Sequence, residues 1–392
     1  AVGDNDANGA MGYSIAFSDA AGNAGTAVTS GSGSVTIDNT HPTLGSVSID
    51  EAGTGNANDG DVITLSFTSS ETIQTSPTCT FTDSASDAMD NSGSITVTDG
   101  GSNAWTCKIT THNSDPNGAI TFSIAFTDSA GNAGVADTTV DDGSSVTIDN
   151  THPTLGSVSI DEAGTGNAND GDVITLSFTS SETIQTSPTC TFTDSASDAM
   201  DNSGSITVTD GGSNAWTCKI TTHNSDPNGA ITFSIAFTDS AGNAGVADTT
   251  VDDGSSVTID NTHPTLSTPA LSDNAGGLDV NNGDTVTLTF TSSSDVTTAP
   301  TCAFTDGASA AMDAGTSTAS GSASGWTCTV AVGDNDANGA MGYSIAFSDA
   351  AGNAGTAVTS GSGSVTIDNT HPTLGSVSID EAGTGNANDG DV

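Results

Sequence analysis

Hydrophobic and polar residues alternate along short stretches of the chain, and clusters of Gly, Asn, Asp and Ser separate these stretches. The clearest alternation lies in residues 119–127, where Ile120, Phe122, Ile124 and Phe126 share one face of an extended strand. Such alternation is typical of half-buried β-strands joined by turns. No stretch has a convincing helical period, so the pattern predicts an all-β fold.

Seven strands are predicted between residues 39 and 149. They cover residues 44–49, 62–68, 78–82, 94–98, 104–110, 119–127 and 135–148, the last being long and interrupted. Their outward positions carry Thr, Ser and Ala, with hardly any of the Lys that usually protects sheet edges. Two interpretations stay open: a plain soluble β-surface, or a surface for lateral assembly or dense O-glycosylation.

The string NTHPTL recurs and sets the domain organisation. It begins at Asn39, Asn150, Asn261 and Asn369, with spacings of 111, 111 and 108 residues. A period near 110 residues matches one autonomous β-sandwich domain. We therefore expect complete domains at residues 39–149, 150–260 and 261–368, the C-terminal part of a repeat at 1–38 and the N-terminal part of another at 369–392.

A second identity relates the two ends of the sequence. Residues 1–62 reproduce residues 331–392 without a difference. We therefore expect the chain to be a window on a longer array.

Composition and charge exclude several partners and activities. The 392 residues include 48 Asp and Glu against two Lys, which gives a formal net charge of −46. This charge excludes nucleic acid and anionic membrane surfaces as natural partners. No apolar run approaches the ~18 residues that span a bilayer. No Ser/His/Asp or Cys/His set recurs at a spacing suited to nucleophilic catalysis, so a non-enzymatic protein is expected.

Six Cys residues fall into pairs, one pair in each complete repeat. Cys79 shares strand parity with Phe81, and Cys107 shares it with Trp105, so both sulfur atoms should face the core. The predicted disulfides are Cys79–Cys107, Cys190–Cys218 and Cys302–Cys328. There is no CxxC motif and no nearby His pair to favour zinc. Persistent disulfides indicate an oxidising, extracellular location, at a cell surface or in a secreted filament.

The residues TDSAGN at 127–132, followed by a strand that ends in VTIDNTHPTL, carry a resemblance to a known family. They resemble tandem bacterial immunoglobulin-like (cadherin-like) repeats of giant extracellular adhesins and surface filaments. The resemblance implies seven-stranded Ig-like β-sandwich domains arranged head to tail in a rod. Two features depart from it: antibody-type domains space their Cys pair more widely, and many adhesin repeats lack Cys.

Acidic loops are the candidate binding sites. The pattern N-x-D-x-N-G at residues 113–118 matches the first half of an EF-hand calcium loop, but the bidentate Glu is missing. Plain turn chemistry explains the same residues. If the strands alternate in direction, the loop at 50–61 and the domain end at Asp149 lie at one pole, which faces the DSAGN turn of the next repeat.

Carboxylates gathered at such a junction repel one another unless a cation lies among them. We expect calcium there, with ligands drawn from Asp50, Asp59, Asp61, Asp149, Asp161, Asp170, Asp172, Asp239 and Asp260. Halophilic surface charge is the competing explanation, and it predicts dependence on ionic strength without preference for divalent ions.

The function expected from these observations is that of an extracellular structural protein, whose repeat array forms a rod or filament with copies of itself as partners. The alternative is an adhesin whose Ig-like modules bind carbohydrate or another surface ligand. Trp105 and Trp216 share core parity with the Cys residues, which leaves few aromatic rings for stacking on sugars.

Overall fold

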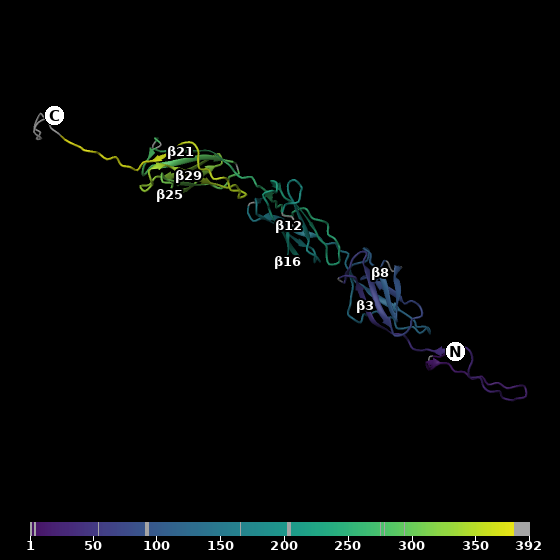
Figure 1. Ribbon diagram of the computed structural model, residues 1–392. Coiled ribbons are helices and arrows are strands. Elements are labelled where there is room, and N and C mark those ends of the chain that lie inside the picture. Colours follow the sequence, from purple (N-terminus) through teal and green to yellow (C-terminus); the bar gives the residue numbers. More distant parts are fainter. Residues whose placement is uncertain are drawn as a thin grey trace, which may run out of the picture.

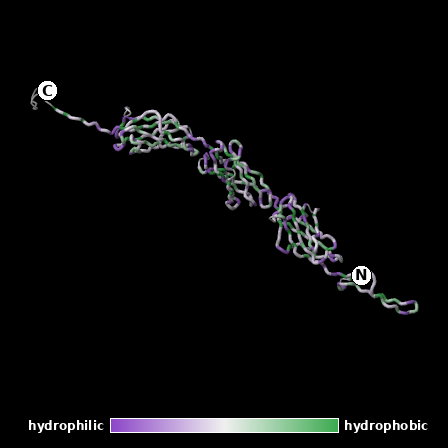
Figure 2. Tube along the Cα trace, in the orientation of Figure 1, coloured by the Kyte–Doolittle hydropathy of each residue, from purple (hydrophilic) through white to green (hydrophobic). Residues whose placement is uncertain are grey.

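A computed structural model describes residues 2–379 except 4, 54, 91–93, 165, 202–204, 275, 278 and 294. The described chain forms three folded bodies in a row, with a hairpin before the first and an extended segment after the third (Figure 1). Hydrophobic and hydrophilic positions alternate along the trace of each body (Figure 2). All named regular elements in this part of the chain are β-strands.

The first body is a sandwich of antiparallel strands with one parallel contact. One layer is a four-stranded sheet in the order β3 (Leu44–Glu51), β5 (Val62–Ser69), β8 (Ala104–Thr110), β7 (Thr96–Gly101). The other layer holds the pair β6 (Thr78–Thr82) and β10 (Thr121–Ala125), and the trio β4 (Asn56–Ala57), β11 (Thr147–Ile148), β9 (Gly118–Ala119). Strand β11 runs parallel to β4 and antiparallel to β9. This order is that of an Ig-like β-sandwich.

The second body repeats this arrangement strand for strand. Its four-stranded sheet is β12 (Leu155–Glu162), β14 (Val173–Ser180), β17 (Ala215–Thr221), β16 (Thr207–Gly212). Its second layer holds β15 (Thr189–Thr193) with β19 (Thr232–Ala236), and β13 (Asn167–Ala168), β20 (Thr258–Ile259), β18 (Gly229–Ala230).

The third body has one additional strand pairing. Its first sheet is β21 (Leu266–Asp273), β23 (Thr285–Ser292), β27 (Gly325–Ala331), β26 (Ser320–Ser322). Its second layer holds β25 (Ala311–Thr318), β24 (Thr301–Thr305), β29 (Gly342–Ala346), and the trio β22 (Asp279–Val280), β30 (Thr366–Ile367), β28 (Gly339–Ala340). Strand β25 extends the sheet before the chain crosses to β26. In the N-terminal hairpin, β1 (Gly9–Ala10) pairs with β2 (Thr36–Ile37).

Each body has its own hydrophobic core. The three clusters of buried residues lie within residues 47–148, 158–259 and 271–367, and no cluster draws residues from two bodies. In the first, the disulfide joins β6 to β8 across the two layers, beside Trp105. The fold is thus a tandem of Ig-like β-sandwiches, as the sequence predicts.

The last predicted strand of each repeat differs from the expectation. Only residues 147–148 of the stretch 135–148 form a ladder, and an isolated bridge joins Asp137 to Ile124. Between these points, the side chains of Asp141 and Ser144 accept hydrogen bonds from the N–H groups of Val47 and Ile49 in place of ladder carbonyls. The predicted strand at 119–127 is likewise broken into β9 and β10, and the two-residue strand β4 was not predicted.

Candidate functional site: the domain junctions

The linker that follows the first repeat is held by that repeat's own loop of residues 113–118. Asn117 donates from Nδ2 to Asp149 Oδ1 over 3.1 Å and to Thr151 Oγ1 over 2.6 Å. The backbone N–H of Asn150 donates back to Asn117 Oδ1 over 2.8 Å, and Asn150 Nδ2 donates to the backbone oxygen of Asp115. The EF-hand-like loop therefore fixes the start of the linker.

The next repeat captures the same linker with its DSAGN turn, residues 239–243. Asp239 is fully buried, and its Oδ1 accepts hydrogen bonds from the backbone N–H groups of Ala241 and Asn243. Asn243 Nδ2 donates both to Asp239 Oδ2 and, over 2.7 Å, to the backbone oxygen of Asp149. His152 Nδ1 lies 2.8 Å from the backbone oxygen of Ala244. The turn thus binds the linker from the opposite side.

In the equivalent turn of the first repeat, backbone and amide N–H groups rather than a basic side chain stabilise the buried carboxylate of Asp128. Burial raises the pKa of Asp128, but hydrogen bonds from the Asn132 side chain and from the N–H groups of Asn132, Ala130 and Gly131 outweigh burial. The net result is a pKa below the ordinary value of an aspartate.

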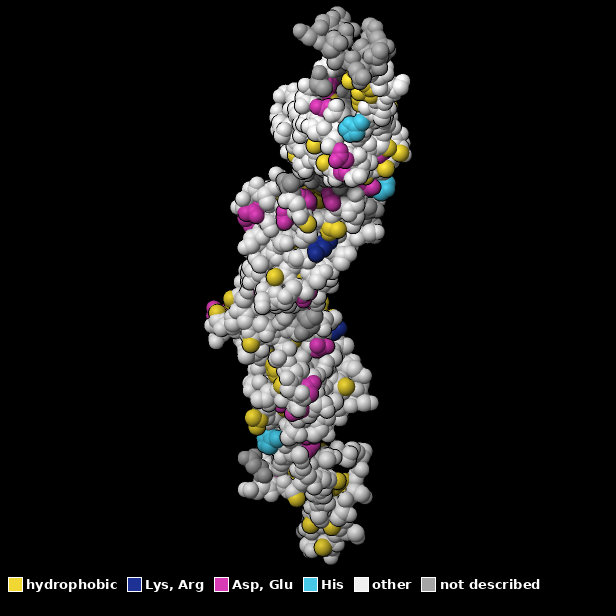
Figure 3. Space-filling view, turned by 90° about the vertical axis from the view of Figure 1, so that its left-hand side faces the viewer, with side chains coloured by type: hydrophobic (Ala, Val, Ile, Leu, Met, Phe, Trp, Pro, Cys, Tyr) yellow, Lys and Arg dark blue, Asp and Glu magenta, His cyan; other side chains and the backbone are white. Residues whose placement is uncertain are grey.

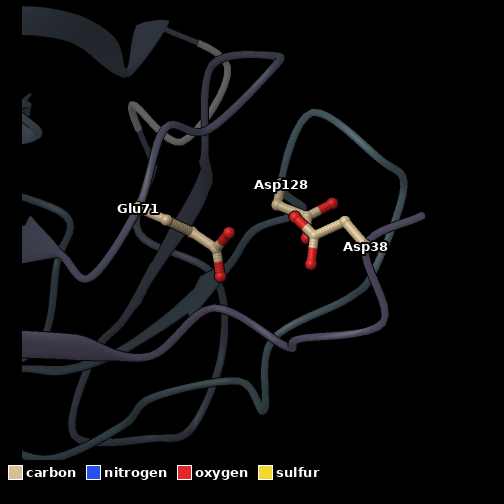
Figure 4. Close-up of side chains that lie close together, drawn as sticks. All are labelled: Asp38, Glu71 and Asp128. Carbon is tan, nitrogen blue, oxygen red and sulfur yellow. The ribbon is translucent and has the colours of Figure 1, made fainter. Parts of the chain in front are cut away.

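Three carboxylates meet where the linker enters each of the first two repeats. We call Asp149, Glu182 and Asp239, and likewise Asp38, Glu71 and Asp128, the carboxylate cluster. In each cluster, one oxygen from every residue lies within 4.8 Å of the others. The Glu71 side chain extends toward the two aspartates (Figure 4).

The glutamate of each cluster has a pKa above its ordinary value. Burial raises the pKa of Glu182 most, followed by the charges of Asp149 and Asp239. The pKa of Glu71 is raised in the same way by burial, Asp38 and Asp128. Oxygen atoms at this separation fit around one Ca²⁺, whose oxygen ligands lie ~2.3–2.6 Å from the ion.

A crevice separates the two repeats beside this cluster. The first repeat contributes Glu51 and Asp61, the second contributes Ser240 and Gly242, and the volume is about 240 Å³. Asn56 Nδ2 donates to Ser240 Oγ across it over 3.3 Å. A Cβ on Gly242, whose φ is +96°, would lie 3.2 Å from Asn58 Nδ2, so the close approach favours glycine. A like crevice of about 260 Å³ lies between the second and third repeats.

The junction before the third repeat keeps the capture but lacks the cluster among the described residues. Asn353 Nδ2 donates to the backbone oxygen of Asp260 over 2.6 Å, as Asn243 does one junction earlier. The position of Glu182 corresponds to Ser294, counted back from the first Cys, and Ser294 lies outside the described residues. This junction is a natural comparison for the other two.

The predicted ligands separate into distinct places. Asp149 and Asp239 come together in the cluster, and Asp260 holds the corresponding linker position one junction later. Asp50 and Asp161 are exposed, next to Thr64 and Thr175 in the strand register. Asp59 and Asp170 accept hydrogen bonds from the N–H groups of Asn113 and Asn224, while Asp61 and Asp172 bind the N–H groups of Asn58 and Asn169 and line the crevices.

Asp38 and Asp128 are the equivalents of the expected ligands Asp149 and Asp239, whereas Glu71 and Glu182 have no counterpart among the ligands expected from the sequence. The strand order places Glu182 at the same pole as the DSAGN turn, and the linker of the preceding repeat enters at that pole. The strand order therefore indicates that Glu182 lies near the two aspartates, but only when its loop, the DSAGN turn and the linker of the preceding repeat are considered together.

The structure also brings together His112, Ser114 and Asp90, which sequence spacing does not reveal. Ser114 Oγ donates to Asp90 Oδ2, and His112 Nδ1 contacts Ser114 Oγ. The serine hydroxyl therefore binds the carboxylate directly, whereas a nucleophilic triad places the imidazole between the two. The His112 and Asp90 side chains are about half exposed. The equivalent His223, Ser225 and Asp201 repeat this arrangement.

The predicted disulfides are present, with Cα–Cα distances of 6.4 Å. Trp105 and Trp216 are buried beside them, with exposed fractions of 8% and 9%.

Acidic side chains are spread along the visible face of the molecule, and basic ones are few (Figure 3). No helix in the described part of the chain has the length and apolar character needed to cross a membrane.

Comparison with solved structures finds tandem immunoglobulin domains. Domains A168–A170 of titin match with 13% identity and a TM-score of 0.32, over 83% of this chain and 99% of that chain. The complex of Dpr2 Ig1–Ig2 with DIP-Theta Ig1–Ig3 matches with 12% identity and a TM-score of 0.25, over 84% and 99%. The N-terminal Ig1–2 module of the Drosophila receptor protein tyrosine phosphatase DLAR matches with 11% identity and a TM-score of 0.19, over 56% and 100%.

No family model matches the sequence, and no curated protein matches it. The identities and TM-scores of the solved structures are low. The Ig-like fold therefore rests on the strand order and register described above, and the matches carry no conclusion about function.

Proposed function

We propose that the chain is a non-enzymatic extracellular structural protein, whose Ig-like repeats form a rod or filament at the cell surface. The observation that carries this proposal is the junction. Each of the three linkers that enter a described repeat is hydrogen-bonded on one side to the loop of the preceding repeat and on the other to the turn of the following repeat, which reads DSAGN in the first two and DAAGN in the third. A linker held on both sides leaves little freedom for the repeats to fold back on one another.

The disulfide in each repeat supports an oxidising location. Uniform units also suit a polymer, because each copy meets the same neighbours. We propose other copies of the chain as partners in a filament or bundle, as in the bacterial adhesin and filament repeats that the sequence resembles.

Immunogold electron microscopy of intact cells, with antibodies against the chain, tests this function. The proposal expects label outside the cell along extended fibres, and intact disulfides in the native protein by non-reducing peptide mapping. Label confined to the cytoplasm, together with free thiols, would contradict it.

We further propose that calcium stiffens the first two junctions through the carboxylate clusters. Glu182, Asp149 and Asp239 come from three separate segments, so an ion bound to all three would tie the linker to the second repeat. The chain has only two Lys to offset 48 acidic residues, and among the described residues neither Lys forms an ion pair with a carboxylate of a cluster. Repulsion within the cluster is therefore not relieved by a basic side chain of the protein.

Thermal unfolding of the whole chain in calcium and in chelator, at matched ionic strength, tests the calcium proposal. We expect calcium to raise the unfolding temperature, and the paired changes Glu71→Gln and Glu182→Gln to abolish the increase. The paired changes Asp50→Asn and Asp161→Asn are the matched control, because they remove the same charge from exposed positions. Equal unfolding temperatures in calcium and chelator would leave halophilic surface charge as the explanation of the acidity.

The alternative of a carbohydrate-binding adhesin is less well supported. Stacking on a sugar requires an exposed aromatic face, and Trp105, Trp216 and Trp326 are all buried. A glycan array with the native chain separates the two functions, since specific sugar binding would favour the adhesin.

A further inference from the structure

The segments by which the chain enters and leaves the first repeat run side by side in the same direction. The entering segment covers residues 47–53 and 55–57, and the leaving segment covers residues 141–149; the two together are called the contact zone. Backbone N–H groups of Thr147 and Asp149 donate to the oxygen atoms of Gly55 and Ala57, each over 2.9 Å. These bonds belong to the parallel pairing of β4 with β11.

Asp141 makes the contact at the other end of this zone. Its backbone N–H donates to the oxygen of Val47 over 2.8 Å, and its Oδ2 accepts from the N–H of Val47, also over 2.8 Å. Ser144 Oγ accepts from the N–H of Ile49 over 2.9 Å. Asp141 therefore satisfies both backbone groups of Val47, as a neighbouring strand would.

A bulge in β3 makes Val47 available for this contact. The register of β3 with β5 shifts between Gly45 and Ser48, and Ser46 has a φ of +56°. A bulge of this kind leaves a residue unpaired in its own ladder. The N–H and C=O groups of Val47 bind Asp141 instead of β5. The second repeat has the same bulge and the same contact through Asp252.

We propose that each repeat bears tension through this contact zone. In the first two repeats, Asp141 and Asp252 act as latch residues, by which we mean that their hydrogen bonds to Val47 and Val158 resist separation of the entering and leaving segments. The linkers leave each body at opposite ends (Figure 1), so a pull along the rod draws the two parallel segments past one another. The hydrogen bonds along the zone are then loaded together, whereas an antiparallel hairpin pulled open at one end breaks its bonds one at a time.

The third repeat provides an internal control, because it closes the same zone with backbone groups. The N–H of Leu271 donates to the oxygen of Ser362 over 3.0 Å, and the N–H of Ser362 donates to the oxygen of Pro269 over 2.8 Å. A parallel bridge joins Ala270 to Ser362. No aspartate side chain takes part in these bonds.

The disulfide limits how far a repeat extends once the zone opens. Cys79 and Cys107 are separated by 28 residues, and both lie outside the contact zone. At ~3.5 Å per extended residue, the closed loop withholds roughly 100 Å of length in each repeat until it is reduced. A repeat that yields under load would therefore extend only in part.

Single-molecule force spectroscopy on the intact chain tests the latch. We expect the double variant Asp141→Ala, Asp252→Ala to lower the unfolding force of two repeats and leave the third unchanged. The unfolding rate of the two weakened repeats should rise by about tenfold, as expected for loss of one hydrogen bond to a charged acceptor. Reduction should lengthen every unfolding step by the withheld length.

Two further variants separate the latch from general loss of stability. Asp99→Ala removes an exposed carboxylate of the first repeat that accepts the N–H of Gly101 and lies outside the contact zone, and it should leave the force unchanged. Met89→Ala opens the buried core and should lower the thermal stability of the first repeat with little change in its unfolding force.

The inference rests on the proposed rod function but can fail separately. Equal unfolding forces for the Asp141→Ala repeat and the unchanged repeat would overturn the latch, as would a loss of force in Met89→Ala as large as in Asp141→Ala. Either result would leave the rod and its junctions intact.

Discussion

Buried carboxylates in this chain are stabilised by N–H donors, because basic side chains are almost absent. Asp128 and Asp239 are fully buried, and each accepts hydrogen bonds from backbone N–H groups and from the Asn four residues later. The residues of the DSAGN turn thus act as a unit. The sequence alone indicates a turn here, but the capture of the preceding linker by Asn132 and Asn243 depends on how two repeats meet, so local pattern could not predict it.

We predict that Asp239→Ala destabilises the second repeat by on the order of 3 kcal/mol, because it removes the acceptor for the N–H groups of Ala241 and Asn243. The equivalent change in the first repeat, Asp128→Ala, should destabilise that repeat strongly at neutral pH and less at low pH. The pKa of Asp128 is lowered on folding, so its contribution is present above the unfolded pKa near ~4 and is lost as the pH falls through the folded pKa. Calorimetry as a function of pH measures both effects, and an unchanged unfolding temperature in Asp239→Ala would contradict the prediction.

Tyr343→Phe should stabilise the third repeat by about 1 kcal/mol, since the buried Tyr343 hydroxyl has no hydrogen-bond partner among the described residues. Burial also raises the pKa of this tyrosine. The first two repeats carry Phe122 and Phe233 at the same place in the strand register, which shows that the site accepts phenylalanine. Chemical denaturation of the variant and the unchanged chain provides the comparison; a less stable variant would mean that the hydroxyl is satisfied in solution.

At the scale of single strands, the alternation of hydrophobic and polar residues predicts the strands that have long regular ladders. It fails where side chains, rather than backbone groups, accept the hydrogen bonds of the neighbouring segment. Strands β5, β6 and β8 begin at the predicted residues. Strand β11 is two residues long because Asp141 and Ser144 bond the neighbouring segment through their side chains. A strand of two residues such as β4 has no period to recognise.

The disulfide between β6 and β8 should contribute roughly 3 to 4 kcal/mol to the first repeat, given the 28-residue separation of Cys79 and Cys107. The double variant Cys79→Ala, Cys107→Ala is therefore expected to unfold at a lower temperature in the first repeat only. The second and third repeats, whose cores share no buried residue with the first, are the controls. Simultaneous loss of all three repeats would mean that their stabilities are coupled.

At the scale of the whole molecule, the sequence predicted only some of the residues that meet at the junction between repeats. Because the end of one repeat faces the DSAGN turn of the next, Asp149 and Asp239 were expected to meet, and one oxygen of each lies in the same cluster. Glu182 was absent from that prediction because its approach depends on the fold of the loop after β14. The acidic residues on the outer face of the sheet, such as Asp50, show that acidity alone does not identify a junction residue.

The cluster predicts that junctions without calcium strengthen on mild acidification. The pKa of Glu182 is raised in the docked junction, so its charge destabilises docking at neutral pH, and protonation relieves this as the pH falls toward the raised pKa. In chelator, therefore, the distance distribution between spin labels on the first and second repeats should narrow between pH 7 and about pH 5. Glu182→Gln should remove this change, and an equal change in that variant would exclude the glutamate as its source.

The central claim is that linkers fixed on both sides hold the repeats in an extended rod. Small-angle X-ray scattering of the intact chain, in calcium and at physiological ionic strength, tests it most directly. The structure predicts an elongated particle with the three bodies in line, as in Figure 1, and a shorter average length when Asn243→Ala and Asn353→Ala release the two captured linkers. A compact particle, or a length that does not change in the double variant, would contradict the claim.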